Sequence, residues 1–128
     1  MADFKQAFKK LIFNEGGYAN DPDDAGGETY MGISRRAHPN AIIWKHVDAV
    51  TAKYKTAREI NAHLKDNAEL NKEIEAIYKS DYWNVFNLDK EKSQRLAMQI
   101  FDDAVNRGVS ATKAAINRVR NEMAMVKK

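Results

Sequence analysis

The chain has 128 residues, of which 44% are hydrophobic and 30% are charged, a balance that fits one globular domain with a single core. It contains no cysteine, which excludes disulfide bridges, thiolate nucleophiles and cysteine-ligated zinc. The 21 basic and 18 acidic side chains leave a formal charge of +3, which suits an anionic polymer as partner but also suits simple solubility. No apolar run is long enough for a membrane span or for a signal peptide, so we expect synthesis in the cytoplasm and no stable membrane insertion.

The N-terminal third is predicted to form one helix, a loop and a small β element. Asp3 is a good N-cap, and apolar side chains follow it at helical spacing, namely Phe4, Ala7, Phe8 and Leu11. Gly16 and Gly17 end this helix. Residues 16–28 are rich in Gly, Asp, Asn and Pro, which indicates a loop, and residues 29–33 are β-prone and are predicted to form one arm of a small hairpin.

The remainder is predicted to be helical, which makes the domain mostly α with an α+β fold. Thr56 and Glu59 have the spacing of a capping box, and an amphipathic helix is expected to run toward Trp83. Apolar residues of segment 96–105 cover most of a helix circumference, which predicts a central buried helix. Ser110 is expected to cap the last helix, with an inward-facing stripe of Ala115, Ile116, Val119, Met123 and Val126.

Glu15 is the strongest candidate for chemistry. It lies roughly 20° around the first helix from both Phe4 and Phe8, so it continues the apolar stripe. Partial burial disfavours the charged carboxylate and raises its pKa, and a carboxylic acid that stays protonated near neutral pH can protonate a glycosidic oxygen. The alternative is a helix-terminal glutamate that turns to water past Gly16 and Gly17.

The loop after Glu15 offers a second carboxylate in Asp21, Asp23 or Asp24. Two carboxyl groups on either side of a glycosidic bond are the working pair of most glycosidases. Ordinary turn chemistry explains an Asp-rich loop equally well. The hydroxyl of Thr29 is placed to orient a water molecule, or Thr29 is present only for its β-propensity.

Metal, cofactor and nucleic-acid sites are not expected. The loop does not have the spacing of an EF-hand, and the three histidines show no ligand spacing. The basic pairs, Arg35 with Arg36 and Arg118 with Arg120, are explained by solvated helix faces, and no nucleic-acid-binding motif is present.

Several motifs together resemble a known family. They are Glu15-Gly-Gly-Tyr18, Asn20-Asp-Pro22, Asp24-Ala-Gly-Gly-Glu-Thr29, Gly32-Ile-Ser34, Ile77-Tyr-Lys-Ser-Asp-Tyr-Trp83 and Phe101-Asp-Asp-Ala-Val-Asn-Arg-Gly108. The set resembles glycoside hydrolase family 108, the N-acetylmuramidases of phages and bacteria that include proteins described as secretion activators. The resemblance extends over roughly residues 4 to 117.

The resemblance implies a lysozyme-like fold, cleavage of the β-1,4 bond between N-acetylmuramic acid and N-acetylglucosamine, and Glu15 as the catalytic acid. A looser similarity to phage lysozymes implies that Asp24 and Thr29 complete the site. It also implies a single muramidase-like domain over 1–128, with a catalytic part to about residue 92 and the shortened start of a peptidoglycan-binding-like part over 93–128. The family usually continues further at this end.

Substrate contacts are expected at Tyr18, Asp21, Tyr82, Trp83 and Asn106. The aromatic members of this set either stack on sugar rings or pack in the core, and Asn106 belongs either to the floor of the site or to a structural hydrogen-bond network.

The sequence therefore predicts a monomeric peptidoglycan hydrolase whose partner is the glycan strand, acting at the cell wall or in the periplasm after release or non-classical export. A lytic transglycosylase is the alternative within catalysis. A non-catalytic wall-binding, secretion or lysis accessory protein with a degenerate muramidase fold is the alternative outside it.

Overall fold

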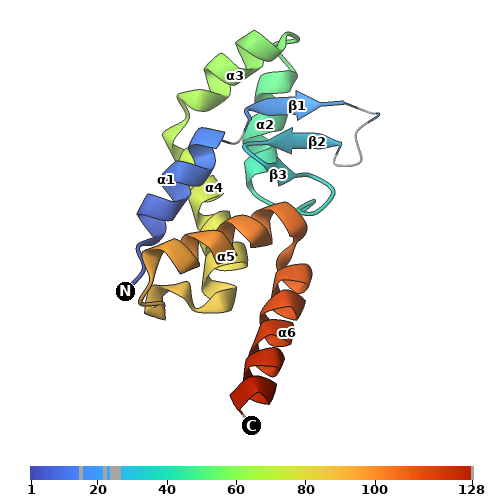
Figure 1. The fold of residues 1–128 in the computed structure, drawn as a ribbon. Coiled ribbons are helices and arrows are strands. Elements are labelled where there is room, and N and C mark those ends of the chain that lie inside the picture. Colours follow the sequence, from blue (N-terminus) through green and yellow to red (C-terminus); the bar gives the residue numbers. More distant parts are fainter. Residues whose placement is uncertain (15, 22, 24–26, 128) are drawn as a thin grey trace. The chain divides into compact units, whose positions relative to one another are not determined.

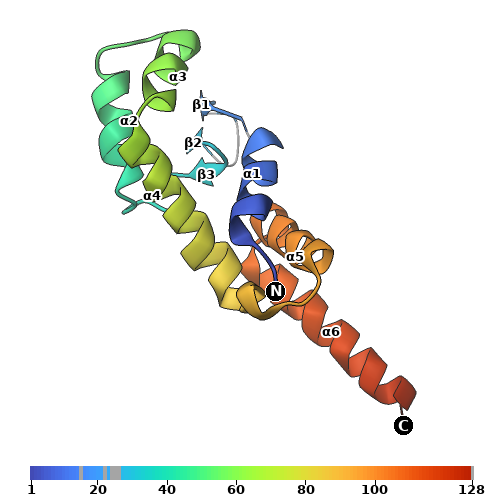
Figure 2. The same ribbon diagram turned by 90° about the vertical axis from the view of Figure 1, so that its left-hand side faces the viewer.

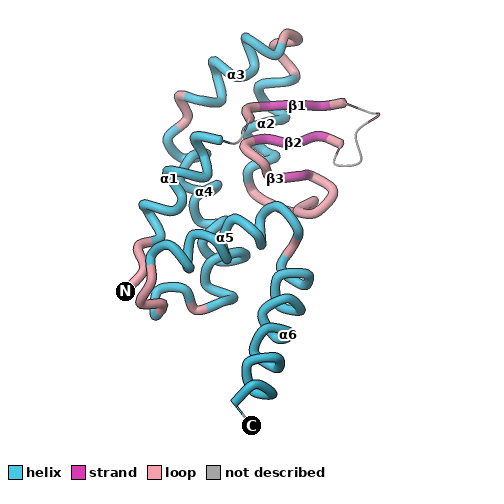
Figure 3. Tube along the Cα trace, in the orientation of Figure 1, coloured by secondary structure: helices cyan, strands magenta, loops and turns pink. Residues whose placement is uncertain are grey.

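A computed structural model describes the chain except for residues 15, 22, 24–26 and 128. Within the described residues it contains six α-helices and a three-stranded antiparallel sheet near the N-terminus, which confirms the mostly α, α+β fold class (Figures 1 and 3). None of the described helices combines the length and the apolar character needed to cross a membrane. The chain divides into two compact units, Phe8–Tyr78 and Met1–Ala7 with Lys79–Lys128, and each is described by itself.

Helix α1 (Phe4–Asn14) follows the predicted stripe, since Phe4, Ala7 and Leu11 are buried. In the unit Phe8–Tyr78 the chain then forms strands β1 (Tyr18–Asn20), β2 (Glu28–Tyr30) and β3 (Ile33–Ser34) in the order β1-β2-β3. The register pairs Ala19 with Thr29 and Thr29 with Ser34.

The β-prone segment 29–33 does not form a single arm, because it contains a turn of its own. Met31 and Gly32 have φ angles of 52° and 82°, the left-handed pair that a two-residue hairpin turn requires. A left-handed methionine is costly, and its carbonyl oxygen accepts a hydrogen bond of 2.6 Å from the Tyr78 hydroxyl. The long-range contact therefore helps to hold a turn that the local sequence disfavours.

Three helices complete this unit, α2 (Ile43–Thr51), α3 (Ala57–Lys65) and α4 (Ala68–Tyr78), and Figure 2 shows them with the sheet. The predicted capping residue is confirmed, because Thr56 Oγ1 accepts the Glu59 N–H at 3.2 Å. Each helix buries an apolar stripe, and the side chains in the core of this unit include Tyr30, Ile33, Ile43, Trp44, Val47, Ile60, Leu64, Leu70, Ile74 and Tyr78.

The larger segment of the second unit starts at Lys79. The helix that was predicted to run toward Trp83 continues there as the π-helical turn Lys79–Trp83. Two 3-10 turns, Asn84–Phe86 and Leu88–Lys90, come next, and helices α5 (Gln94–Arg107) and α6 (Val109–Lys127) follow. The core is an edge-to-face cluster in which the ring centroids of Phe4, Trp83 and Phe101 are 5.4 to 5.8 Å apart.

Three helical expectations for this unit are wrong. Helix α5 is not buried all round, because it buries Ala97, Phe101 and Ala104 while Leu96 is 44% exposed. The stripe on α6 does not face inward throughout, since Val119 and Met123 are exposed; the side chain of Val126 lies outside the described residues. Ser110 is not the cap of α6, which begins at Val109 directly after Gly108.

Candidate active site

Two of the three predicted catalytic residues, Glu15 and Asp24, lie outside the described residues. The structure describes what surrounds them in the sequence, namely the end of α1 at Asn14, the pair Gly16 and Gly17, and strands β1 and β2. The site is therefore built from the contacts of these flanking segments.

Gly17 lies against a side chain from α3. A Cβ atom on Gly17 would lie 2.3 Å from Asn61 Oδ1, whereas one on Gly16 would meet nothing within 4 Å. The same Oδ1 atom accepts the Tyr18 N–H at 2.8 Å. Among the described residues, Asn61 therefore takes the space beside Gly17, whereas the space beside Gly16 is open. Asn61 therefore fixes the backbone two residues after Glu15.

Tyr18 is bound at its other end to Glu28. Its hydroxyl donates to Glu28 Oε2 at 2.6 Å, across the β1–β2 pair. Burial, and then the hydrogen bond to this carboxylate, raise the pKa of Tyr18 to about 12. These contacts give Tyr18 a structural role that the prediction of a sugar contact did not include.

Thr29 and Asp21 differ in their surroundings. Thr29 is half-buried in the middle of the sheet, and the alternation of strand residues places its side chain on the face opposite to Glu28 and Tyr30. Asp21 is exposed, and its Oδ1 atom accepts the Asp23 N–H at 2.9 Å. This contact is the turn chemistry that the sequence allowed as an alternative.

Glu28 is a half-buried charged residue whose contacts the sequence did not reveal. Its side chain is 14% exposed, and its Oε1 atom lies 2.9 Å from Arg35 Nη1. The other end of the Arg35 guanidinium donates to both carboxylate oxygens of Asp48, each at 2.8 Å. The only signal in the sequence is a charged residue between Gly27 and the β-prone Thr29, and such a residue is as typical of a solvated strand edge.

The remaining predicted substrate contacts belong to the other unit. Trp83 is completely buried, and its Nε1 atom donates to Asp89 Oδ1 at 2.8 Å, so its surroundings favour packing. Tyr82 is half-buried, and burial followed by the charge of Asp81 raises its pKa. Asn106 is exposed on α5. Of the predicted site residues that the structure describes, Tyr18, Asp21 and Thr29 lie in one unit with the motif that contains Glu15.

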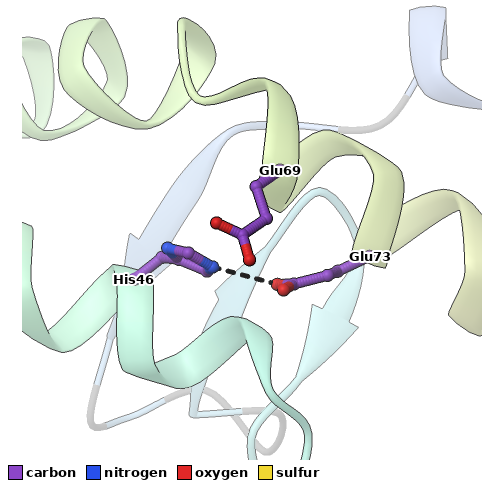
Figure 4. A group of neighbouring side chains, drawn as sticks. All are labelled: His46, Glu69 and Glu73. Carbon is purple, nitrogen blue, oxygen red and sulfur yellow. Dashed lines mark ion pairs between the residues drawn. The ribbon is translucent and has the colours of Figure 1, made fainter.

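Three side chains with metal-ligating atoms also meet in the unit Phe8–Tyr78. His46 on α2 faces Glu69 and Glu73 on α4, with one ligand atom of each within 4.8 Å of the others (Figure 4). The sequence offered no sign of this group, because His46 is more than 20 residues from both glutamates.

The hydrogen bonds around His46 do not suit a metal ion. Asn67 caps α4 by accepting the Leu70 N–H through Oδ1 at 3.0 Å, which turns its amide nitrogen toward His46 Nδ1 at 3.1 Å. Nδ1 is then an acceptor, so Nε2 carries the proton and has no lone pair for a metal. Glu73 Oε2 lies 3.1 Å from Nε2 but is not aligned for a hydrogen bond and stays unsatisfied. We assign this group to a polar contact between α2 and α4.

Comparison with known proteins identifies the family of this chain. No curated protein and no solved structure matches the chain. The family model described as glycosyl hydrolase 108 matches residues 8–108, which include Gly16 and Gly17, the sheet and all of α5. Because the match covers most of the chain, it confirms the family suggested by the sequence motifs. The chain belongs to the glycosyl hydrolase 108 family.

Proposed function

We propose that the protein is an N-acetylmuramidase that hydrolyses the β-1,4 bond between N-acetylmuramic acid and N-acetylglucosamine in peptidoglycan. The observation that supports this proposal most strongly is the family match over residues 8–108, which spans the Glu15 motif and the hairpin. Its substrate is the glycan strand, and it acts as a monomer at the cell wall or in the periplasm after release or non-classical export.

In the proposed mechanism Glu15 is protonated and donates its proton to the glycosidic oxygen as the bond breaks. An oxocarbenium-like sugar forms, and Asp24 either stabilises its charge or activates a water molecule on the opposite face. Thr29 orients that water. The separation of the two carboxyl groups decides between inversion and retention, since inverting enzymes leave room for a water molecule.

The described contacts support this assignment of roles. A catalytic acid must point in a fixed direction. Helices and strands fix the direction of a side chain more precisely than loops do. Here the chain that follows Glu15 is tied to α3 through Asn61 and to β2 through Tyr18 and Glu28. These ties restrict the orientation of Tyr18, three residues after the proposed proton donor in the sequence.

The test is the loss of turbidity of purified peptidoglycan with the wild type and with Glu15→Gln, which keeps the shape and removes the proton donor. We expect clearing by the wild type and at least a ~100-fold slower rate for Glu15→Gln. Glu122→Gln on the exposed face of α6 is the matched control and should clear at the wild-type rate.

Each of the other outcomes would indicate a different function for the protein. Clearing by both the wild type and Glu15→Gln would exclude Glu15 as the acid. Clearing by neither, with both proteins folded and bound to peptidoglycan, would indicate a non-catalytic wall-binding protein. Products that lack one water would identify a lytic transglycosylase.

A further inference from the structure

We propose that Glu28 is a positioning residue of this site, which holds the β1–β2 hairpin in a fixed orientation on helix α2. The segment that joins these strands contains Asp24, and the second strand carries Thr29. This inference rests on the proposed function, because it assigns a role in the reaction to a residue that does not meet the substrate.

Glu28 connects two neighbours in different directions. Its Oε2 atom accepts the Tyr18 hydroxyl at 2.6 Å and so joins β2 to β1. Its Oε1 atom lies 2.9 Å from Arg35 Nη1, just beyond the end of β3. A carboxylate with both oxygens bound to groups on separate segments has little freedom to rotate, and hydrogen bonds to charged groups are the strong ones.

Arg35 extends this connection to α2. Its Nη2 atom donates to both Asp48 oxygens at 2.8 Å, and its guanidinium carbon lies 4.8 Å from the centre of the Trp44 ring. Asp48 and Trp44 are both in α2. A continuous series of polar contacts therefore runs from β1 to α2 through Tyr18, Glu28, Arg35 and Asp48. We name this series the Tyr18–Asp48 chain.

Burial identifies Glu28 as the member on which this chain depends. The side chain of Glu28 is 14% exposed, whereas that of Asp48 is 59% exposed. An exposed ion pair contributes little to stability, and the cost of removing one partner rises as that partner becomes less exposed. Loss of the Glu28 charge should therefore disturb the hairpin more than loss of the Asp48 charge.

The pleat of β2 connects this chain to the candidate site. Glu28 and Tyr30 point to one face of the strand and Thr29 points to the other. A rotation of the strand about its axis at Glu28 therefore changes the direction of the Thr29 hydroxyl. Small displacements of positioning groups can lower the rate of a reaction about a hundredfold without a matching loss of binding.

The experiment compares Glu28→Gln with Glu73→Gln in kinetics on solubilised glycan strands. Glu73 is a matched control, because its side chain is 21% exposed and pairs with His46 on the same helix α2, but it holds α4 and not the hairpin. We expect Glu28→Gln to lower kcat by about tenfold to a hundredfold with KM within about twofold of the wild type. Glu73→Gln should retain the wild-type kcat even if its melting temperature falls.

Two further measurements decide the remaining cases. If Glu28→Gln does not fold, Tyr18→Phe takes its place, since it keeps the ring and removes only the hydroxyl that binds Glu28, and it should lower kcat. If the wild type is inactive, the proposed function fails, and amide hydrogen exchange over residues 18–35 then tests Glu28. Faster exchange there in Glu28→Gln but not in Glu73→Gln supports its role in holding the hairpin. Two kinetic results would overturn the proposal, namely equal kcat losses in the two glutamine variants or a wild-type kcat in Glu28→Gln. If the wild type is inactive, unchanged amide exchange in Glu28→Gln would overturn it.

Discussion

Both compact units bury an apolar core, and they differ in the contacts that accompany it. In the unit Phe8–Tyr78 the hairpin is tied to its helices by polar groups, namely Asn61 on the Tyr18 backbone and the Tyr18–Asp48 chain. In the other unit the rings of Phe4, Trp83 and Phe101 pack edge to face, and Trp83 is completely buried. Polar contacts depend strongly on direction, whereas apolar burial is nearly independent of it.

This difference matches the location of the candidate site. The unit with the directional contacts contains the Glu15 motif, where atoms must be held in place. Apolar burial is the main source of folding free energy in both units, and in the second unit it is concentrated in the aromatic cluster. Substitutions of the polar contacts around the hairpin should therefore change orientation more than stability, and substitutions in the aromatic cluster should do the reverse.

The largest effect on stability is expected for Trp83→Ala. The substitution empties a completely buried site and removes two aromatic contacts, so the free energy of unfolding should fall by about 3–5 kcal/mol. Urea denaturation followed by circular dichroism measures this loss. A loss below about 1 kcal/mol would show that the aromatic cluster is not the centre of its unit.

A smaller effect is expected for Gly17→Ala, with Gly16→Ala as its control. The new methyl group at position 17 forces Asn61 away and breaks its bond to the Tyr18 N–H, which should cost about 1–2 kcal/mol. At position 16 a methyl group meets nothing, and the change should be within about 0.5 kcal/mol. Equal losses at both positions in urea denaturation would contradict the contact with Asn61.

Alkaline pH should weaken the hairpin unit through Tyr18. The pKa of its phenol is raised from 10.0 to about 12, so the folded state holds this proton more tightly than the unfolded state. The resulting stabilisation is complete below pH 10 and is lost as the pH rises toward 12. Melting temperatures across this range should fall less steeply for Tyr18→Phe than for the wild type. Identical slopes would show that the hydroxyl is not held by Glu28.

The smallest effect is expected at Asp103 in the other unit. Hydrogen bonds from Arg107 and Thr112 lower the pKa of its carboxyl below the usual 3.8. A lowered pKa stabilises the fold above pH 3.8, and this contribution is lost as the pH falls further. Because the ion pair is largely exposed, Asp103→Asn should shift the acid melting curve only slightly. A change in melting temperature for Asp103→Asn at acid pH that exceeds the change for Tyr18→Phe at alkaline pH would contradict this ranking of the two contacts.

The sequence predicted the fold class and the first helix because both follow from local periodicity. The apolar stripe Phe4, Ala7 and Leu11 and the cap at Thr56 depend on residues within one or two turns. The burial of α5 and α6 was predicted wrongly for the reverse reason. An apolar residue such as Leu96 or Val119 is buried only if another element covers it, and periodicity does not reveal which elements do so.

The candidate site was proposed from motifs, whereas the contacts around it were not foreseen. Glu15 was selected by its place on the first helix and by the family resemblance, Asp24 and Thr29 were selected by the looser similarity to phage lysozymes, and all three remain predictions. Asn61 was missed, since it meets Tyr18 from 43 residues away in the sequence. Glu28 was overlooked because a glutamate in a short strand shows its partner only when the fold brings Arg35 beside it.

The most direct test of the proposed activity is the mass of the products formed from purified glycan strands in water enriched in oxygen-18. Hydrolysis with Glu15 as the acid predicts N-acetylmuramic acid at the new reducing ends, one heavy oxygen for each bond broken, and at least ~100-fold slower product formation by Glu15→Gln. Anhydro products without heavy oxygen, or labelled products from Glu15→Gln at the wild-type rate, would contradict the account.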